Sequence, residues 1–314
     1  MTQSYSTLLL RLSFLLALVG SLPVQQPLIR TKRGYNMEKA KVDEHPWMVS
    51  IYNPNLGHPD DHACGGTLIA DRWVLTAAHC FLNGLRIKEP TKKPTENFRV
   101  VAGHVDRNRT EDLQSRTIER VELYGWVDGG QSDNYIYANQ FKAYYDIALV
   151  KLSSAFDSSD NSIQKIDFLA SSTCSTGREL DFSGWGFTKN EPPKSKPLRT
   201  SAMTVKDWKH CHGKDEYSEA FENESLYCAH DPDFSSKPCK FDSGSPYTLE
   251  TATNETILVG VHSGPYEGGK CEQISETEQQ YGDMRVVNVA YPAYQQWIKN
   301  NVGEESVNFM PCPN

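Results

Sequence analysis

The chain of 314 residues is 38% hydrophobic and carries a formal net charge of −8, which allows a sizeable core without a partner and argues against nucleic acid as a ligand. Residues 1–33 hold four basic residues and no acidic one, so the remainder has 28 basic against 40 acidic residues, a formal net charge of −12. All-β units of about 200–250 residues often fold as one domain, so the length does not require a second.

The first residues have the composition of a secretion signal. Residues 1–24 contain no acidic residue, and an apolar stretch runs from Leu8 to Leu22. The uninterrupted apolar run that begins at Phe14 is too short to span a membrane. We therefore expect a signal peptide over residues 1–21, a secreted, extracellular protein and no membrane partner.

Two further features fit export to an oxidising compartment. An even number of cysteines is typical of a disulfide framework, and N-x-S/T acceptors predict glycosylation of a secreted chain. The eight cysteines are Cys64, Cys80, Cys174, Cys211, Cys228, Cys239, Cys271 and Cys312, and the three acceptors are Asn108, Asn223 and Asn254.

Residues 25–33, QQPLIRTKR, form a polar segment that ends in a basic cluster. The run from Arg30 to Arg33 matches the pattern cut by processing proteases whose acidic pockets accept arginine and lysine side chains. It predicts a propeptide over residues 22–33 with cleavage after Arg33. A solvated linker is the alternative interpretation, since runs of charge are often no more than that.

From residue 47 onward the apolar residues lie in short runs rather than at a helical period. The runs are rich in β-branched and aromatic residues and are separated by Gly, Pro, Asn and Asp, which predicts the strands of a barrel or sandwich. They are WMVSI, GTLI, RWVLTAAH, FRVVAG, IALVKL, ILVGV and MRVVNVAY. Only residues 291–302 have the spacing of an amphipathic helix. The polar stretches 83–98 and 122–145 are expected to be inserted loops.

Three separated segments carry residue types used in nucleophilic catalysis. LTAAHC places His79 beside a cysteine, DIALVKL places Asp146 at the head of a buried strand, and DSGSP supplies Ser243. A serine hydroxyl needs a nearby base, and that imidazole needs a buried carboxylate to fix its tautomer and stabilise its positive form. Taken singly, each segment is more typical of a disulfide, a strand start or a turn.

Together with HPWMVSI (45–51), CGGTLIADRWVLTAAHC (64–80) and SGWG (183–186), these segments resemble the motifs of the chymotrypsin-like (trypsin-fold) serine proteases. The resemblance implies an all-β fold of two six-stranded antiparallel β-barrels with a C-terminal α-helix and the active site between the barrels. It places a peptidase domain over residues 34–302 and a tail over residues 303–314.

By motif position, the resemblance makes His79 the general base, Asp146 its orienting acid and Ser243 the nucleophile that forms an acyl-enzyme. It implies no cofactor and no metal. Metal binding by the three residues from His210 to His212 is a competing interpretation of that segment.

The resemblance also implies the disulfides Cys64–Cys80, Cys211–Cys228 and Cys239–Cys271. Another bridge of the family has no counterpart, because Leu180 or Asp181 and Leu249 occupy its two places. The two cysteines that remain, Cys174 and Cys312, would then join the C-terminal tail to the body.

The nucleophile segment departs from the family pattern. The implied oxyanion hole uses the N–H groups of Ser243 and Phe241, and the family glycine at position 241 allows a turn conformation that a side chain resists. Ser245, in place of a second glycine, is a milder change. Activation would pair the new amine of Gly34 with Asp242, although Gly34 lacks the usual aliphatic side chain. That Asp242 only caps a turn is the alternative.

The substrate-binding positions depart from it as well. Lys237 stands where trypsin-like members carry an aspartate, so a preference for basic side chains is not expected and acidic ones would be favoured. The alternative is that Lys237 points to solvent. Ser263 is kept, but Gly264 replaces a tryptophan and Pro265 lacks the N–H that would pair with substrate.

Two functions follow from these observations. The first is a secreted serine endopeptidase, made as a zymogen, with protein or peptide substrates, non-tryptic specificity and protein inhibitors as further partners. The second is a catalytically weak or inactive binding or regulatory protein, motivated by Phe241, Pro265 and Gly34. The effect of replacing Ser243 by alanine separates the two.

Overall fold

A computed structural model gives the fold of this chain. It describes residues 37–41, 43–56, 61–83, 91–108, 113–126, 145–159, 161–188, 194–211, 224–232, 236–265, 283–303 and 306–312. The chain divides into the units Met1–Lys32 and Arg33–Asn314, and the described residues all belong to the second. The predicted signal peptide and propeptide lie outside them. Within the described ranges, no helix has the length and apolar character needed to cross a bilayer.

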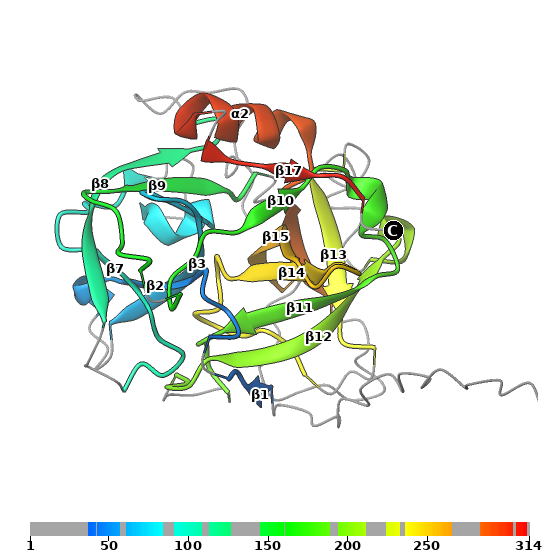
Figure 1. Cartoon of the computed structure of the whole chain (residues 1–314), viewed down its shortest axis with the longest axis horizontal. Helices are drawn as coiled ribbons and strands as arrows, with labels where there is room; N and C mark the ends of the chain where they lie inside the picture. Colours follow the sequence, from blue (N-terminus) through cyan, green and yellow to red (C-terminus); the bar gives the residue numbers. More distant parts are fainter. Residues whose placement is uncertain are drawn as a thin grey trace, which may run out of the picture. The chain divides into compact units, whose positions relative to one another are not determined.

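The first barrel is a closed ring of six strands (Figure 1). In ring order these are β2 (Met48–Tyr52), β3 (His62–Ala70), β4 (Trp73–Thr76), β9 (Ala148–Leu152), β8 (Gln114–Leu123) and β7 (Arg99–Ala102). Every neighbouring pair is antiparallel. Five of the six strands overlap apolar runs of the sequence, because β-branched side chains pack well on a pleated surface. β8 overlaps none of them, since exposed residues alternate with half-buried ones along most of its length.

The second barrel is also a ring of six antiparallel strands, closed by the pairing of β14 with β15. In ring order these are β14 (Pro246–Glu250), β11 (Glu179–Gly184), β12 (Arg199–Lys206), β13 (Leu226–His230), β16 (Met284–Asn288) and β15 (Thr256–Pro265). Two six-stranded barrels were the prediction from the sequence, and the structure confirms them.

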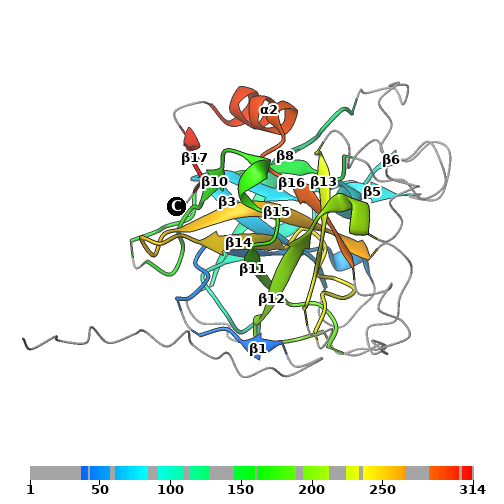
Figure 2. The ribbon, with the colours of Figure 1, turned by 90° about the vertical axis from the view of Figure 1, so that its right-hand side faces the viewer.

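Short elements extend this framework. β10 (Asp167–Leu169) pairs in parallel with β15, and β17 (Phe309–Met310) pairs in parallel with β10, so the tail adds to the sheet edge beside α2 (Pro292–Val302) (Figure 2). The stretch expected as a loop over 83–98 contributes to the pairing of β5 (Leu82–Asn83) with β6 (Thr91–Lys92). The remaining short elements are β1 (Glu38–Lys39), which pairs with β12, and the 3₁₀ turns η1 (Pro54–Leu56), η2 (Ala78–Phe81), η3 (Ser172–Cys174) and η4 (Trp208–His210).

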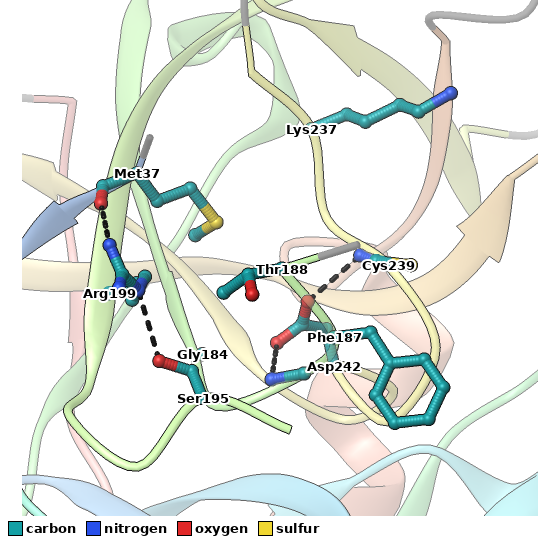
Figure 3. A pocket seen from close by; sticks show the side chains of 10 residues that line it. Met37, Gly184, Phe187, Thr188, Ser195, Arg199, Lys237, Cys239 and Asp242 are labelled. Carbon is teal, nitrogen blue, oxygen red and sulfur yellow. Dashed lines mark hydrogen bonds between the residues drawn. The ribbon is translucent and has the colours of Figure 1, made fainter. Parts of the chain in front are cut away.

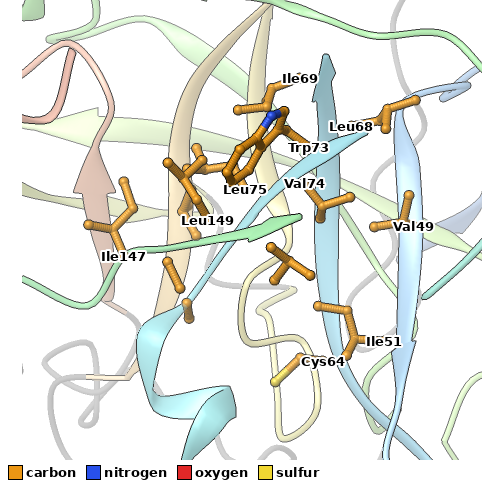
Figure 4. Packing of buried hydrophobic residues seen from close by; sticks show 14 of the residues in the cluster. Val49, Ile51, Cys64, Leu68, Ile69, Trp73, Val74, Leu75, Ile147 and Leu149 are labelled. Atoms are coloured by element: carbon orange, nitrogen blue, oxygen red, sulfur yellow. The ribbon is translucent and has the colours of Figure 1, made fainter. Parts of the chain in front are cut away.

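The core of the first barrel fixes two of the candidate residues. Val74, Leu75 and Leu149 are fully buried in one apolar cluster (Figure 4), and β4 pairs with β9 so that Thr76 lies opposite Ala148. The end of β4 therefore lies beside the start of β9. His79 follows the first strand by three residues and Asp146 precedes the second by two. Apolar burial, at about 25 cal/mol per Å², thus stabilises the arrangement that brings them together.

Three disulfides join described residues: Cys64–Cys80, Cys211–Cys228 and Cys174–Cys312. All three match predicted pairs. Cys239 is also disulfide-bonded, but Cys271 lies outside the described residues, so that pairing stays a prediction. Because Cys211 is oxidised, its thiolate is not available to bind a metal with the neighbouring histidines. At the places of the missing family bridge, Leu180 and Leu249 are buried in one apolar cluster instead.

We predict that replacing both Cys174 and Cys312 by alanine lowers the free energy of unfolding by about 2–4 kcal/mol. The bridge spans 138 residues of sequence, and its loss releases the tail whose Phe309 ring stacks on Phe168 at 4.9 Å. Urea unfolding of both proteins without reductant measures the difference. Equal unfolding midpoints would show that the tail is held by β-pairing alone.

Candidate active site

A buried carboxylate lies at the centre of the site. The Asp146 side chain is 0% exposed and accepts three hydrogen bonds from described residues. The His79 backbone N–H donates to Oδ1 over 2.9 Å, His79 Nδ1 donates to Oδ2 over 2.6 Å, and Ser263 Oγ donates to Oδ2 over 2.7 Å. With its proton on Nδ1, the imidazole has Nε2 left as a base. The structure thus brings together His79, Asp146 and Ser263.

These donors decide the charge of Asp146. Burial alone would raise its pKa, but the His79 ring, through its charge and its hydrogen bond, and the Ser263 hydroxyl outweigh that effect and hold the pKa below its usual value. The carboxylate is therefore ionised at neutral pH. An ionised partner is what an imidazole needs if it is to gain a proton during a reaction.

Ser243 lies in a turn that is pinned to the first barrel. Its carbonyl accepts the N–H of Gly65 on β3 over 2.9 Å. The next residue, Gly244, has φ +82, and a Cβ there would lie 2.0 Å from Thr76 Oγ1. Only glycine allows both this backbone conformation and this close approach. The turn therefore lies against the end of β4, three residues before His79.

The third predicted residue does not make its expected hydrogen bond. Ser243 is partly exposed, and among the described residues no hydrogen bond joins its Oγ to the ring of His79. Such bonds are often long or poorly aligned before substrate binds. The structure therefore holds the base and the acid in hydrogen-bonded contact, and it holds the turn that bears Ser243 against β3 and the end of β4.

Phe241 adopts the positive-φ backbone conformation that glycine takes easily and a bulky side chain resists. Its φ is +72, in the left-handed region that disfavours a bulky L residue by about 1–2 kcal/mol. The carbonyl of Lys240, in the same peptide group as the Phe241 N–H, accepts the N–H of Phe187 over 2.9 Å. Because C=O and N–H point in opposite directions in a trans peptide, this bond turns the Phe241 N–H away from Phe187.

Ser245 fits with less strain. It is fully buried, its φ is not positive, and its Oγ has no hydrogen-bond partner among the described residues. A Cβ on Gly65 would lie 2.2 Å from that oxygen. The glycine on β3 therefore makes room for the serine that replaces a glycine in the turn, although its buried hydroxyl without a described partner is itself unfavourable by about 1–3 kcal/mol.

Asp242 lines a hollow beside this turn, with its carboxylate held by two neutral backbone groups (Figure 3). It accepts the N–H of Gly186 over 2.7 Å and that of Cys239 over 2.8 Å. Burial raises its pKa to about 7, although both hydrogen bonds act against that rise. Asp242 therefore does more than cap its own turn, because Gly186 belongs to a distant segment. Arg33 and Gly34 lie outside the described residues.

The predicted substrate-binding residues have different surroundings. Lys237 is only 9% exposed, so it does not point freely to solvent, and its side chain extends away from Asp242 in Figure 3. Gly264 has φ +133, which favours glycine there. Pro265 is the last residue of β15 and lies opposite Met284. Ser263 contacts Asp146 directly.

Glycosylation acceptors must be exposed. Asn108 and Asn254 are both exposed, the second with φ +59 in a turn. Asn223 lies outside the described residues.

The structure adds residues that sequence reasoning missed. His62 Nε2 donates to the Phe241 carbonyl over 3.1 Å, while its Nδ1 lies 2.6 Å from Ser50 Oγ. His262, whose pKa is lowered by burial to about 3, bonds Tyr247 behind the nucleophile turn. The only feature of the sequence that pointed to His262 was its position directly before Ser263. Nothing in the sequence pointed to His62, because its partner Phe241 is 179 residues away.

One cluster has the donor atoms of a metal site, formed by Cys64, His79 and Cys80. Both cysteines are consumed by their disulfide. The described part of the chain therefore contains no cluster of this kind with free thiolates.

A comparison with protein families gives one match. The family model described as Trypsin matches residues 35–297. The match covers both barrels and the residues His79, Asp146 and Ser243.

We predict that Ser263→Ala lowers the free energy of unfolding at neutral pH by about 1.5–3 kcal/mol, the usual contribution of a hydrogen bond to a charged group. Because the pKa of Asp146 is lowered in the folded protein, the deficit should shrink as pH falls through that pKa and the carboxylate is protonated. Urea unfolding at neutral and acidic pH measures it.

The control is Ser195→Ala, which removes a hydroxyl that donates to the neutral Pro197 carbonyl over 2.7 Å and accepts from Arg199, whose charge does not titrate in this pH range. The loss of unfolding free energy in this control should not depend on pH. If the loss in Ser263→Ala were also independent of pH, the assignment of a charged acceptor to Ser263 would be contradicted.

Proposed function

The chain belongs to the trypsin family, and on this premise we propose that it is a secreted serine endopeptidase that acts through an acyl-enzyme. His79 removes the proton from Ser243 as Oγ attacks the carbonyl carbon of a peptide bond. The protonated ring then gives that proton to the leaving amine, and water attacks the acyl-enzyme with His79 again as base. Asp146 stays ionised throughout and stabilises the imidazolium.

One observation carries this proposal. The His79 ring is held through Nδ1 by a buried carboxylate, and the turn that bears Ser243 is hydrogen-bonded to Gly65 on β3, next to Cys64, whose Sγ lies within 4.8 Å of a His79 ring nitrogen. This supports a reaction in which the Ser243 hydroxyl, the His79 base and the ionised Asp146 act together. The N–H groups of Ser243 and Phe241 are the proposed donors to the oxyanion of the tetrahedral intermediate.

The proposal includes synthesis as a zymogen. Residues 1–21 would be removed as a signal peptide and residues 22–33 as a propeptide, which leaves Gly34 as the new terminus. Its amine would pair with Asp242 in the hollow of Figure 3. The raised pKa of Asp242 supports this role, because burial favours the protonated carboxyl more strongly than the two backbone hydrogen bonds and the charge of Arg107 favour the ionised one. A new amine beside it would favour the ionised form.

For the substrate, we propose proteins or peptides with a non-tryptic preference, and protein inhibitors as further partners. Lys237 is buried, and a cationic side chain at that position of the specificity pocket would repel lysine and arginine and attract acidic residues. We also propose glycosylation at Asn108, Asn223 and Asn254.

We predict that a fluorophosphonate labels the protein after cleavage behind Arg33 and that Ser243→Ala abolishes the label, because the reagent bonds covalently to an activated serine. Asp146→Asn should slow labelling about 10⁴-fold, since it leaves the imidazole in the wrong tautomer. The label is located by mass spectrometry. Failure of the cleaved protein to react, while a control protease reacts, would reject the proposal.

We predict that the free energy of unfolding depends on pH differently in the uncleaved and the cleaved chain. In the uncleaved chain the pKa of Asp242 is raised from 3.8 to about 7, so the free energy of unfolding should fall as pH rises across that interval. Pairing with the Gly34 amine should lower this pKa and remove the fall. Urea unfolding across the interval measures both.

Asp242→Asn is the control for the uncleaved chain and should flatten its profile. A fall of equal size before and after cleavage would contradict pairing with the new terminus.

A second function is favoured by one observation, the missing hydrogen bond between Ser243 Oγ and His79 among the described residues. It is a binding or regulatory protein that has kept the family's scaffold with little or no catalysis. In that case Ser243→Ala would leave the biological effect of the protein unchanged, whereas loss of the effect favours the enzyme.

A further inference from the structure

We propose that Lys194 is a positioning residue for the oxyanion hole, because it holds Phe241 in the conformation that presents its backbone N–H. The inference rests on the proposed function, in which that N–H is a donor to the reacting oxygen. It goes further by assigning a role to a residue outside the three motifs that carry the triad.

The strain at Phe241 requires an explanation. A bulky residue at φ +72 is an outlier that persists only where its surroundings hold it in place. If the backbone relaxed to negative φ, the peptide between Lys240 and Phe241 would reorient, and its N–H would no longer be aimed at a fixed point. The neighbours of Phe241 therefore determine whether the donor is in place.

The ring of Phe241 is held by two side chains from one backbone pairing. Phe187 and Lys194 form an isolated antiparallel bridge, which puts their side chains on the same face. The Phe187 ring lies 4.9 Å from the Phe241 ring, centroid to centroid. The Lys194 ammonium lies 3.9 Å from the same centroid, within the range of a cation–π contact.

Lys194 also contacts the residue that holds the Phe241 backbone. Its Nζ donates to the carbonyl of His62, and His62 Nε2 donates to the carbonyl of Phe241. Lys194 is 4% exposed and His62 is fully buried, so water competes little with these contacts. Lys194 therefore connects to Phe241 twice, through the ring and through His62. We call Phe187, Lys194 and His62 the Phe241 clamp.

Phe187 fixes the orientation of the peptide group between Lys240 and Phe241. Its backbone N–H fixes the Lys240 carbonyl over 2.9 Å, while its ring packs on Phe241. The bridge to Lys194 positions this segment. Loss of the Lys194 ammonium would remove its contact with the Phe241 ring and weaken the position of Phe187, its partner in the bridge. The Phe241 N–H would then no longer be held in one direction.

The test is a double-mutant cycle between Lys194→Met and Phe241→Gly in the protein cleaved behind Arg33. Methionine keeps an apolar stem but removes the charge and the donor. We expect Lys194→Met to slow fluorophosphonate labelling and peptide turnover by about 10- to 100-fold. This loss is smaller than the about 10²–10³-fold loss of kcat when an oxyanion-hole donor is removed altogether. KM should change less than about 2-fold. Lys194→Arg, which keeps a cation and donors, should retain most of the rate.

The glycine background gives the decisive comparison. Glycine adopts positive φ without support, so Lys194→Met should change the rate less than about 2-fold when residue 241 is glycine. An equal loss in both backgrounds, or no loss in the chain with Phe241, would overturn the inference and leave the proposed function standing.

Thermal unfolding of the same four proteins tests the clamp without any activity. If Phe241 and Lys194 hold each other, their effects on the melting temperature should be non-additive, with a smaller effect of Lys194→Met in the glycine background. Additive effects would overturn the inference. If the parent protein neither labels nor turns over substrate, the proposed function fails and this unfolding cycle alone decides whether the clamp exists.

Discussion

The arrangement of the candidate site depends on the buried negative charge of Asp146. The Asp146 carboxylate has no exposure to water, and an isolated ion in such a place would be strongly unfavourable. Three donors make it stable, two from His79 in the first barrel and one from Ser263 in the second. Because one of these donors comes from the second barrel, packing of the two barrels adds to the stabilisation of the charge. Its stabilisation and the orientation of the imidazole are thus consequences of the same packing.

A second constraint acts at the nucleophile turn, where neighbouring residues compensate one another. Phe241 takes a conformation that glycine would adopt freely, with φ +72, and His62, Phe187 and Lys194 surround it. Gly65 leaves space for the Ser245 hydroxyl. Asp242, directly before the nucleophile, is held by Gly186 and Cys239. Residues that look unfavourable for a catalytic turn are accommodated by partners that lie far away in sequence.

The sequence predicted the barrels and much of the site, and the reasons for the remaining differences are physical. Short apolar runs and ordered motifs report burial and local backbone shape, so many of the strands, the helix and the candidate residues His79, Asp146 and Ser243 were accessible. The strands β8, β12 and β13 were not, because they carry no such run. The Phe241 clamp was not, since a cation–π contact from Lys194 leaves no periodic pattern. The burial of Lys237 was equally hidden, because solvent exposure is the ordinary expectation for lysine. The roles of these residues stay predictions until they are measured.

A crystal structure of the cleaved protein after reaction with a fluorophosphonate would show the nucleophile and its oxyanion donors together. We expect phosphorus bonded to Ser243 Oγ and the phosphoryl oxygen within hydrogen-bond distance of the Phe241 and Ser243 backbone nitrogens. We also expect that the His79 ring still donates to Asp146. A crystal in which the reagent is absent from Ser243, or in which the phosphoryl oxygen points away from Phe241, would contradict the proposed mechanism.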